Sequence, residues 1–205
     1  MYKFKCEHGH SGLEHTACFE RNNIDLRKMG YFDIEATQLK ADFGFILSWY
    51  IKEKGKEVYQ KGTVTRESIL SGELDKSSIR EMVNAIKEYD CIVTYYGSMF
   101  DIPYGRTRAL MQGLSFIPPR IVKHIDLYWT VKTKFKFFNN KLETACRNFG
   151  IEGKTHINPK LWIMASCGSE PAIEEVLEHN YQDVKILELL HEKIGEFVNP
   201  VEKFI

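Results

Sequence analysis

The 205-residue sequence has no apolar run close to the roughly 20 residues that a transmembrane helix needs. Its first residues, MYKFKCEHGH, contain no apolar stretch of the kind that forms the centre of a signal peptide. The five cysteines form no even set of closely spaced pairs, which argues against a disulfide framework. Internal repeats and low-complexity segments are missing as well. We therefore expect an intracellular, cytoplasmic protein with no membrane partner.

Excess charge of one sign is also missing, because 28 basic residues balance 28 acidic ones. The overall charge therefore points to neither nucleic acid nor membrane as a partner. Along the chain, however, the charge is uneven: residues 120–160 carry nine Lys and Arg against three Asp and Glu, whereas residues 170–205 carry three against nine. A neutral total can therefore coexist with a basic surface.

The chain divides into a short polar segment and one larger α/β region. Residues 1–28 are rich in Cys and His and poor in aliphatic residues, and the apolar pattern begins at residue 29. We expect a small N-terminal appendage over 1–28 and one domain over 29–205. Three strands come first and helices then alternate with further strands, which predicts a mixed sheet flanked by helices. The expected strands are 29–36, 44–52, 57–65, 91–96 and one ending within 122–129, and the expected helices are 77–89, 101–114, 140–150 and 170–198.

The stretch GYFDIEAT places two carboxylates on a strand that otherwise has the pattern of a buried one. Side chains at i and i+2 on a strand share a face, so Asp33 and Glu35 point the same way and Ile34 points to the opposite side. Burying charge without a partner is expensive. Either the strand lies at a sheet edge with one solvated acidic face, or cations offset the two carboxylates.

Further acids bear on this choice. Asp101 directly follows the apolar run CIVTYYGSMF, where loops at strand ends present functional groups, although an Asp there can also cap the next helix. Asp183 lies in mid-helix, where Asp is a poor helix former, and His179 lies four residues earlier on the same helical face. A surface His–Asp pair is the alternative interpretation. Asp126 is a fifth acid near the strand ends, and of two roles, support of the site or a cap on the following helix, we expect the cap.

In order and spacing these acids resemble the motifs of the DEDD (DnaQ-like) 3′–5′ exonucleases, which have the ribonuclease H-like fold. Asp33 and Glu35 match the first motif, D-x-E. The stretch GSMFD at residues 97–101 matches the second motif, G-x-x-F-D, and Asp183 matches the final Asp of the third. The resemblance covers about residues 29–195. It is closest to the branch of polymerase-B-type proofreading exonuclease domains and their free-standing relatives.

The sequence departs from these motifs at two positions. Tyr96 precedes Gly97, where many relatives have Asn. His179 stands four residues before Asp183, in the position of the tyrosine of one subclass, whereas the histidine of the other subclass lies five residues before. Neither departure removes an acid of the motifs.

The resemblance implies a nuclease whose four carboxylates hold two Mg²⁺ or Mn²⁺ ions. Asp33 would bridge both ions, and Glu35 with Asp183 would hold the ion on the side of the attacking water. Asp101 would position the second ion through its water ligands, and His179 would orient or deprotonate the attacking water. The implied reaction is 3′–5′ exonucleolytic hydrolysis of single-stranded DNA or RNA ends; whether a protein partner takes part stays open. An endonuclease of the same fold and a non-catalytic nucleic-acid-binding module are the alternatives.

The N-terminal stretch CEHGHSGLEHTAC contains five potential zinc ligands within thirteen residues, namely Cys6, His8, His10, His15 and Cys18. Structural zinc sites take four Cys or His ligands. The segment has too little apolar content to pack a core of its own, and a metal would explain how it orders. We expect one structural Zn²⁺ held by four of the five residues, with the choice between the first two histidines open. A disordered His-rich tail or a tag remnant is the alternative.

Basic and aromatic residues alternate in KTKFKFFNNK, residues 132–141. Basic side chains can follow phosphates and aromatic rings can stack on bases, so we expect substrate contacts at Lys132 and Lys134. Phenylalanines that belong to the core beside merely solvated lysines are the alternative. Arg106 is a further candidate for phosphate contact, while Arg108 suits either a phosphate or an ion pair.

Overall fold

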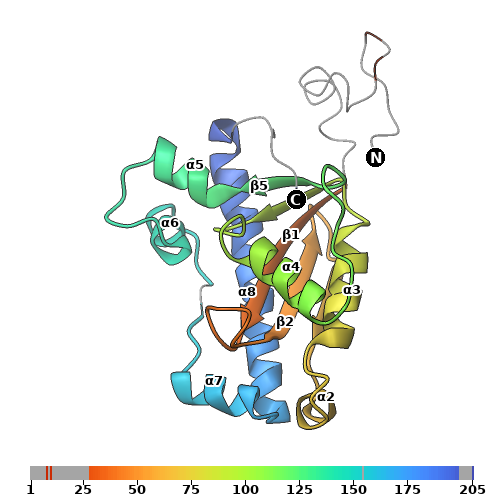
Figure 1. The fold of residues 1–205 in the computed structure, drawn as a ribbon. Helices are drawn as coiled ribbons and strands as arrows, with labels where there is room; N and C mark the ends of the chain where they lie inside the picture. Colours follow the sequence, from red (N-terminus) through yellow and green to blue (C-terminus); the bar gives the residue numbers. More distant parts are fainter. Residues whose placement is uncertain (1–7, 9, 11–27, 154, 199–204) are drawn as a thin grey trace.

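The computed structural model describes residues 8, 10, 28–153, 155–198 and 205 (Figure 1). Strands and short helices come first, and a long helix followed by a 3₁₀ turn comes last. The strands are β1 (Met29–Ala36), β2 (Ile46–Glu53), β3 (Tyr59–Thr63), β4 (Cys91–Thr94) and β5 (Lys123–Asp126). The helices are α2 (Arg66–Leu70), α3 (Lys76–Ile86), α4 (Asp101–Met111), α5 (Leu127–Lys134), α6 (Leu142–Asn148), α7 (Pro159–Ser166), α8 (Glu170–Ile194) and the 3₁₀ turn η2 (Gly195–Phe197).

Strand β1 lies at the centre of the sheet, whose order is β3-β2-β1-β4-β5. β2 pairs with β1 antiparallel, with Asp33 opposite Tyr50 and Glu35 opposite Ser48. On the other side β4 pairs with β1 in parallel, and β5 continues the sheet in parallel with β4. The expected mixed sheet flanked by helices is confirmed. The edge-strand interpretation of β1 is wrong, because a neighbouring strand pairs with each of its sides.

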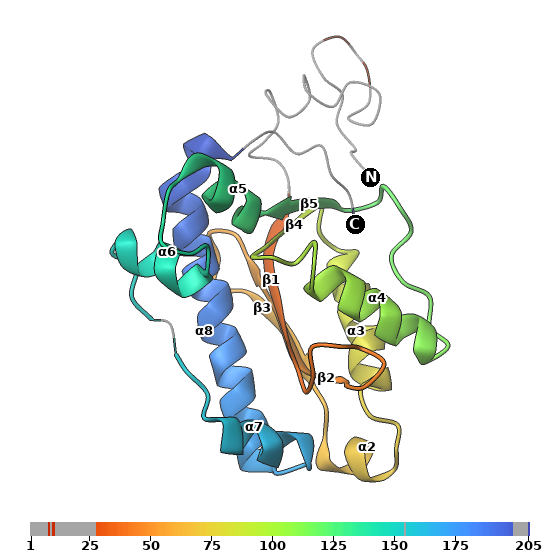
Figure 2. The same ribbon diagram turned by 60° about the vertical axis from the view of Figure 1, so that its left-hand side comes forward.

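Helices cover both faces of the sheet, with α3 and α4 on one face and α8 on the other (Figure 2). Phe32 and Ile34 of β1 pack with Ile79 of α3 in one core cluster. Tyr31 packs with Leu187 of α8 in a second cluster, on the opposite face. Successive residues of β1 therefore belong to different layers, as the two-residue period of a strand requires.

Three short helices, α2, α5 and α7, lie outside the helix ranges expected from the sequence. Asn158 caps α7 by accepting a hydrogen bond from the backbone N–H of Lys160, and Pro159 is its first residue. Ala165 of this helix packs against Leu47 of β2. An Asn-Pro start is a helix signal, but so short a helix shows too few turns for apolar periodicity to identify it.

A buried ion pair joins β2, α3 and α4. The carboxylate of Asp75 is fully buried and accepts hydrogen bonds from the guanidinium of Arg108 at 2.9 and 2.6 Å and from the backbone N–H of Ile46 at 2.8 Å. Of the two alternatives for Arg108, the ion pair is therefore the one observed. Removing one partner of such a pair typically costs about 3–5 kcal/mol, because the other charge stays buried.

Most of the predicted zinc-binding segment lies outside the described residues, including Cys6, His15 and Cys18. His8 and His10 are described and exposed, with ring centroids 6.4 Å apart. None of the described helices combines the length and the apolar character that crossing a membrane requires.

His191 of α8 is held against the sheet, with its Nδ1 atom 3.0 Å from the hydroxyl of Tyr31. Burial lowers the pKa of His191 to about 4, from an ordinary value of 6.5, and the charge of Lys54 acts in the same direction. As the pH falls from 6.5 to about 4, the unfolded chain takes up a proton at this position that the folded chain does not. The free energy of unfolding therefore decreases as the pH falls through this window.

We predict that His191→Gln, which removes the titrating group, makes the free energy of unfolding fall less steeply between pH 6.5 and 4. Urea denaturation at a series of pH values measures the slope. His156→Gln removes an exposed histidine and should keep the wild-type slope. Identical slopes for wild type and His191→Gln would contradict the prediction.

Candidate active site

The two carboxylates of β1 face α8. Asp33 and Glu35 lie on the same side of the strand as Tyr31, which packs in the cluster of α8. Both acids are half-buried, while Phe32 and Ile34 between and beside them are buried on the opposite face. The strand thus carries its acids into the layer between sheet and helix rather than into solvent.

Helix α8 brings an imidazole and a third carboxylate to this face. The Nε2 atom of His179 lies 3.4 Å from Oε1 of Glu35. Glu35, His179 and Asp183 each offer one potential ligand atom, and these atoms all lie within 4.8 Å of one another. The four-residue spacing on the helix puts His179 and Asp183 on one face, so two elements far apart in the sequence form one cluster. We call Glu35, His179 and Asp183 the acidic cluster.

Asp101 reaches β1 from the other direction. It is the first residue of α4 and forms no side-chain cap, so the capping interpretation from the sequence is wrong. Its carboxylate accepts a hydrogen bond at 3.0 Å from the backbone N–H of Ile34, the residue between the two strand acids. Burial raises the pKa of Asp101 to about 7, against the backbone hydrogen bonds that lower it, and the charge of Asp126 raises it further.

The turn that leads from β4 to Asp101 is fixed by Asp126. This carboxylate accepts hydrogen bonds from the backbone N–H groups of Tyr96 at 2.7 Å and Ser98 at 3.0 Å. It also caps α5 by accepting from the N–H of Tyr128, as the sequence predicted. A Cβ at Gly97 would lie 2.3 Å from Oγ1 of Thr94, so glycine is required here by close approach rather than by an unusual φ.

One of the predicted substrate contacts shares α4 with Asp101, and the other two lie on α5, which carries none of the candidate metal-binding acids. Arg106 is exposed on α4, with its guanidinium 5.5 Å from the ring centroid of Phe116. Lys132 and Lys134 are exposed on α5, and the ammonium of Lys132 lies 5.0 Å from the ring centroid of Trp129.

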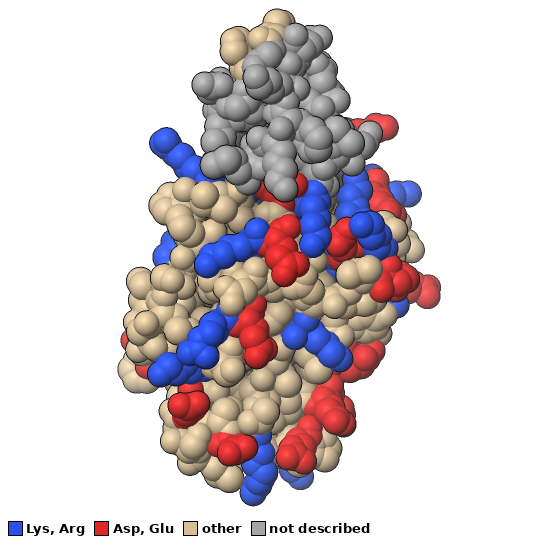
Figure 3. Space-filling model, turned by 90° about the vertical axis from the view of Figure 1, so that its right-hand side faces the viewer, with Lys and Arg blue, Asp and Glu red and all other residues tan. Residues whose placement is uncertain are grey.

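Of the interleaved phenylalanines, two belong to the core and one does not. Phe135 and Phe137 pack against the cluster of α8, which agrees with the core interpretation, whereas Phe138 is 99% exposed. The side of the molecule seen in Figure 3 mixes Lys and Arg with Asp and Glu. No broad patch of one sign covers the described residues on that side.

Two further residues near the acids, Asn180 and Thr155, were not identified as candidate functional residues from the sequence. The side-chain amide of Asn180 donates to the backbone carbonyl of Asp33 at 3.4 Å and links α8 to β1. The hydroxyl of Thr155 contacts Nδ1 of His179. Asn180 is a buried polar residue in mid-helix, which is a weak sign of a role. Thr155 lies in a loop, whose path cannot be predicted from local patterns.

The donor atoms of the acidic cluster fit a divalent cation. Carboxylate oxygens suit Mg²⁺ and Mn²⁺, and an imidazole nitrogen is acceptable to transition metals. Glu35 and Asp183 supply the oxygens and His179 the nitrogen. Asp33 and Asp101 lie outside this group of three, although Asp33 shares its strand face and Asp101 binds the strand between the two acids.

Comparisons with solved structures show the fold. The family B DNA polymerase from the hyperthermophilic archaeon Pyrobaculum calidifontis superimposes with a TM-score of 0.65 at 20% identity. The match covers 82% of this chain and 24% of the polymerase.

Sequence comparisons point the same way. A DNA polymerase of Methanocaldococcus jannaschii is 31% identical over 150 residues, which are 62% of this chain and 9% of that protein. DNA polymerase 1 of Sulfurisphaera ohwakuensis is 37% identical over 93 residues, 39% of this chain and 9% of that protein. The chain thus matches less than a tenth of the length of these two curated relatives. The relationship to B-type polymerases predicted from the motifs is confirmed.

A family model described as the RNase H superfamily matches residues 30–195. The match includes β1 from Gly30 onwards, the turn before α4 and all of α8, and so spans every acid discussed above. The chain belongs to the ribonuclease H superfamily.

Proposed function

We propose that this chain is a metal-dependent nuclease that hydrolyses phosphodiester bonds from the 3′ end of single-stranded DNA or RNA. The observation that carries the proposal is the convergence of Glu35, His179 and Asp183 within 4.8 Å from the first strand and the last helix. The similarity to DNA polymerases supports a nucleic-acid substrate.

The proposed cofactors are two Mg²⁺ or Mn²⁺ ions, held by Asp33, Glu35, Asp101 and Asp183. When bound, such ions lower the pKa of an attacking water and stabilise the leaving oxygen of the phosphodiester. In such a site the buried carboxylate of Asp101, whose pKa burial raises to about 7, gains a positive partner that favours its ionised form.

We assign proton transfer to His179. Its Nε2 atom lies 3.4 Å from Oε1 of Glu35, and with the four carboxylates as the metal ligands it would keep its lone pair to accept a proton from the attacking water. The hydroxyl of Thr155 at Nδ1 holds the orientation of the ring, since a partner at one ring nitrogen sets the role of the other. Asn180 supports this arrangement because it ties the backbone of β1 to α8.

The sequence motifs favour an exonuclease over the two alternatives, an endonuclease of the same fold and a non-catalytic nucleic-acid-binding module. The GSMFD stretch and the histidine four residues before Asp183 match the exonuclease branch better than other nucleases of the fold. An intact set of acids argues against a binding module without activity. The domain division belongs to the same proposal, with a zinc-binding segment over 1–28 and the nuclease domain over 29–205.

A 5′-labelled single-stranded oligonucleotide, incubated with the protein and Mg²⁺ or Mn²⁺, tests the reaction and its direction. We expect a ladder of products that shorten from the 3′ end, for DNA or for the RNA of the same sequence, and no cleavage of a circular strand. Cleavage of the circle would instead identify an endonuclease. Binding without cleavage under all these conditions would contradict the nuclease proposal.

Asp33→Asn and Asp183→Asn remove a negative charge at nearly constant shape. We predict that each lowers the cleavage rate by at least about 100-fold, because even outer-shell residues of metal sites typically contribute 10–100-fold. Thermal unfolding should show that both variants stay folded. Asp42→Asn and Glu174→Gln change exposed acids and should cleave at the wild-type rate. Wild-type cleavage by either site variant would refute the assignment of that residue.

The zinc proposal is tested by the metal content of the protein. Freshly purified protein should contain about one Zn²⁺ per chain, since structural sites use four Cys or His ligands for one ion. Cys18→Ala should lose it, whereas Cys167→Ala, which changes an exposed cysteine, should keep it. Elemental analysis gives the stoichiometry, and a chain without zinc would refute the proposal.

A further inference from the structure

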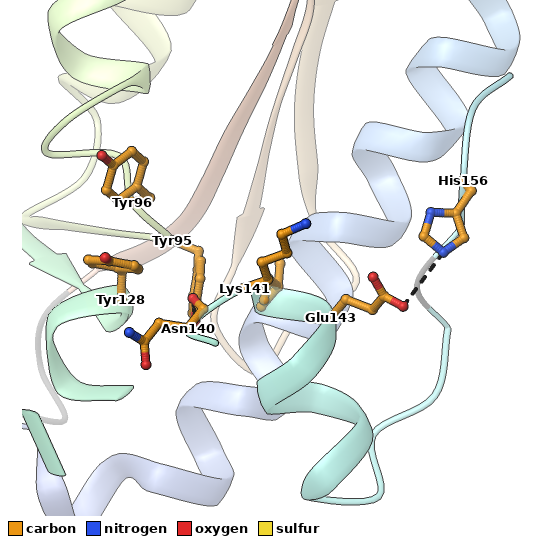
Figure 4. Close-up of a pocket in the computed structure, with 8 residues that line it drawn as sticks. Tyr95, Tyr96, Tyr128, Asn140, Lys141, Glu143 and His156 are labelled. Atoms are coloured by element: carbon orange, nitrogen blue, oxygen red, sulfur yellow. Dashed lines mark hydrogen bonds and ion pairs between the residues drawn. The ribbon is translucent and has the colours of Figure 1, made fainter. Parts of the chain in front are cut away.

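A pocket of about 630 Å³ lies beside the candidate active site, with a size typical of ligand sites. Figure 4 shows tyrosines on one side, an ion pair on the other and a lysine between them. The side chains that matter here are Tyr95, Tyr96, Tyr128, Lys141, Glu143 and His156. None of them has a part in the proposed hydrolysis.

The backbone of Tyr96 adopts the left-handed conformation, with φ of 67°. This conformation is unfavourable for a bulky residue and easier for Asn. It is held by the hydrogen bond to Asp126 and by the carbonyl of Tyr96, which accepts from the N–H groups of Met99 and Phe100. The side chain is 43% exposed, so core packing does not explain the ring. Strain of this kind is found at functional sites.

The three tyrosines are fixed relative to one another. The ring centroids of Tyr96 and Tyr128 lie 4.7 Å apart at 70°, and those of Tyr95 and Tyr128 lie 6.0 Å apart at 89°. The hydroxyl of Tyr95 donates to the backbone carbonyl of Asn140 at 2.7 Å. The pocket therefore has a preformed aromatic wall, and aromatic rings of this kind stack with nucleobases of any sequence.

The pocket adjoins the catalytic residues at two points. Tyr96 begins the turn that ends at Asp101. On the opposite side, His156 directly follows Thr155, whose hydroxyl contacts His179. A ligand in the pocket would thus lie between two segments that also carry active-site residues.

Positive charge accompanies the aromatic wall. The ammonium of Lys132 lies 5.6 Å from the ring centroid of Tyr128, and Lys141 lines the pocket itself. Both lysines are exposed. Ammonium groups next to aromatic rings match the chemistry of a nucleotide, which combines a phosphate with a flat base.

We propose that this pocket binds one unpaired nucleobase of the substrate strand, next to the nucleotide that is removed, with Tyr96 as the stacking surface. Lys132 and Lys141 contact the phosphates on either side of that base. The inference rests on the proposed nuclease function and names its substrate as a strand with unstacked bases. A base inside a duplex is stacked between its neighbours and cannot enter, so the pocket selects single strands.

A short fluorescein-labelled single-stranded DNA in which one abasic residue is moved along the strand tests the proposal. Binding is measured by fluorescence anisotropy with Ca²⁺ in place of Mg²⁺, and the RNA of the same sequence is measured in parallel. For wild type we expect one position near the 3′ end where loss of the base weakens binding by ~10-fold, the usual size of one base–aromatic stack. Tyr96→Asn should weaken binding of the intact strand by about the same factor and abolish the penalty at that position.

Two variants separate stacking from structure. Tyr96→Phe keeps the ring and should keep the abasic penalty, whereas Leu70→Asn changes an exposed residue of α2 and should bind as wild type. The melting temperature of Tyr96→Asn should equal or exceed that of wild type, because Asn accepts the left-handed conformation more readily. A clear loss of stability in this variant would show that the ring serves the fold and would overturn the proposal.

The base-binding pocket and the nuclease activity can each fail independently in these experiments. Wild-type affinity of Tyr96→Asn, or an abasic series without a sensitive position, overturns the base pocket even if the protein cleaves DNA or RNA. A sensitive position that depends on Tyr96, in a protein that cleaves neither nucleic acid with Mg²⁺ or Mn²⁺, supports the pocket and overturns the nuclease.

Discussion

Negative charge enclosed between β1 and α8 is the constraint on which the rest of the structure depends. The side chains of Asp33 and Glu35 on β1 point towards α8, and α8 adds a third acid, Asp183, and the imidazole of His179. Like charges so close together repel, and partial burial strengthens the repulsion. Apolar packing on the same face, including Tyr31 against Leu187, has to hold the two elements together despite it. A divalent cation is the simplest group that turns this repulsion into attraction.

A second set of acids is stabilised by backbone N–H groups instead. Asp126 accepts from the turn after β4 and from the first turn of α5, and Asp101 accepts from Ile34. These hydrogen bonds position the turn between β4 and α4 relative to β1. The tyrosine wall of the pocket belongs to the same turn, since Tyr96 is one of the residues held by Asp126. The carboxylate of Asp126 therefore positions both Asp101 and the tyrosine wall of the pocket.

Much of this arrangement could be predicted from local patterns in the sequence. Alternation along GYFDIEAT puts Asp33 and Glu35 on one face, and the four-residue spacing of His179 and Asp183 does the same on a helix. That β1 lies in the middle of the sheet could not be predicted, because strand order depends on contacts between distant segments. The hydrogen bond between Asp101 and the backbone of Ile34 could not be predicted for the same reason, because the two residues are 67 positions apart.

The short length of β4 has a consequence for Asp101. β4 ends at Thr94, whereas β1 continues to Ala36, and the parallel pairing between them ends at Tyr31. Beyond that point the backbone N–H of Ile34 donates a hydrogen bond to the carboxylate of Asp101, in place of the backbone carbonyl that a longer β4 would have offered. The side chain of Asp101 thus continues the hydrogen bonding along β1 where the pairing with β4 ends. Any substitution of Asp101 therefore alters the hydrogen bonding of β1 as well as the proposed metal site, and its effect on cleavage would combine both.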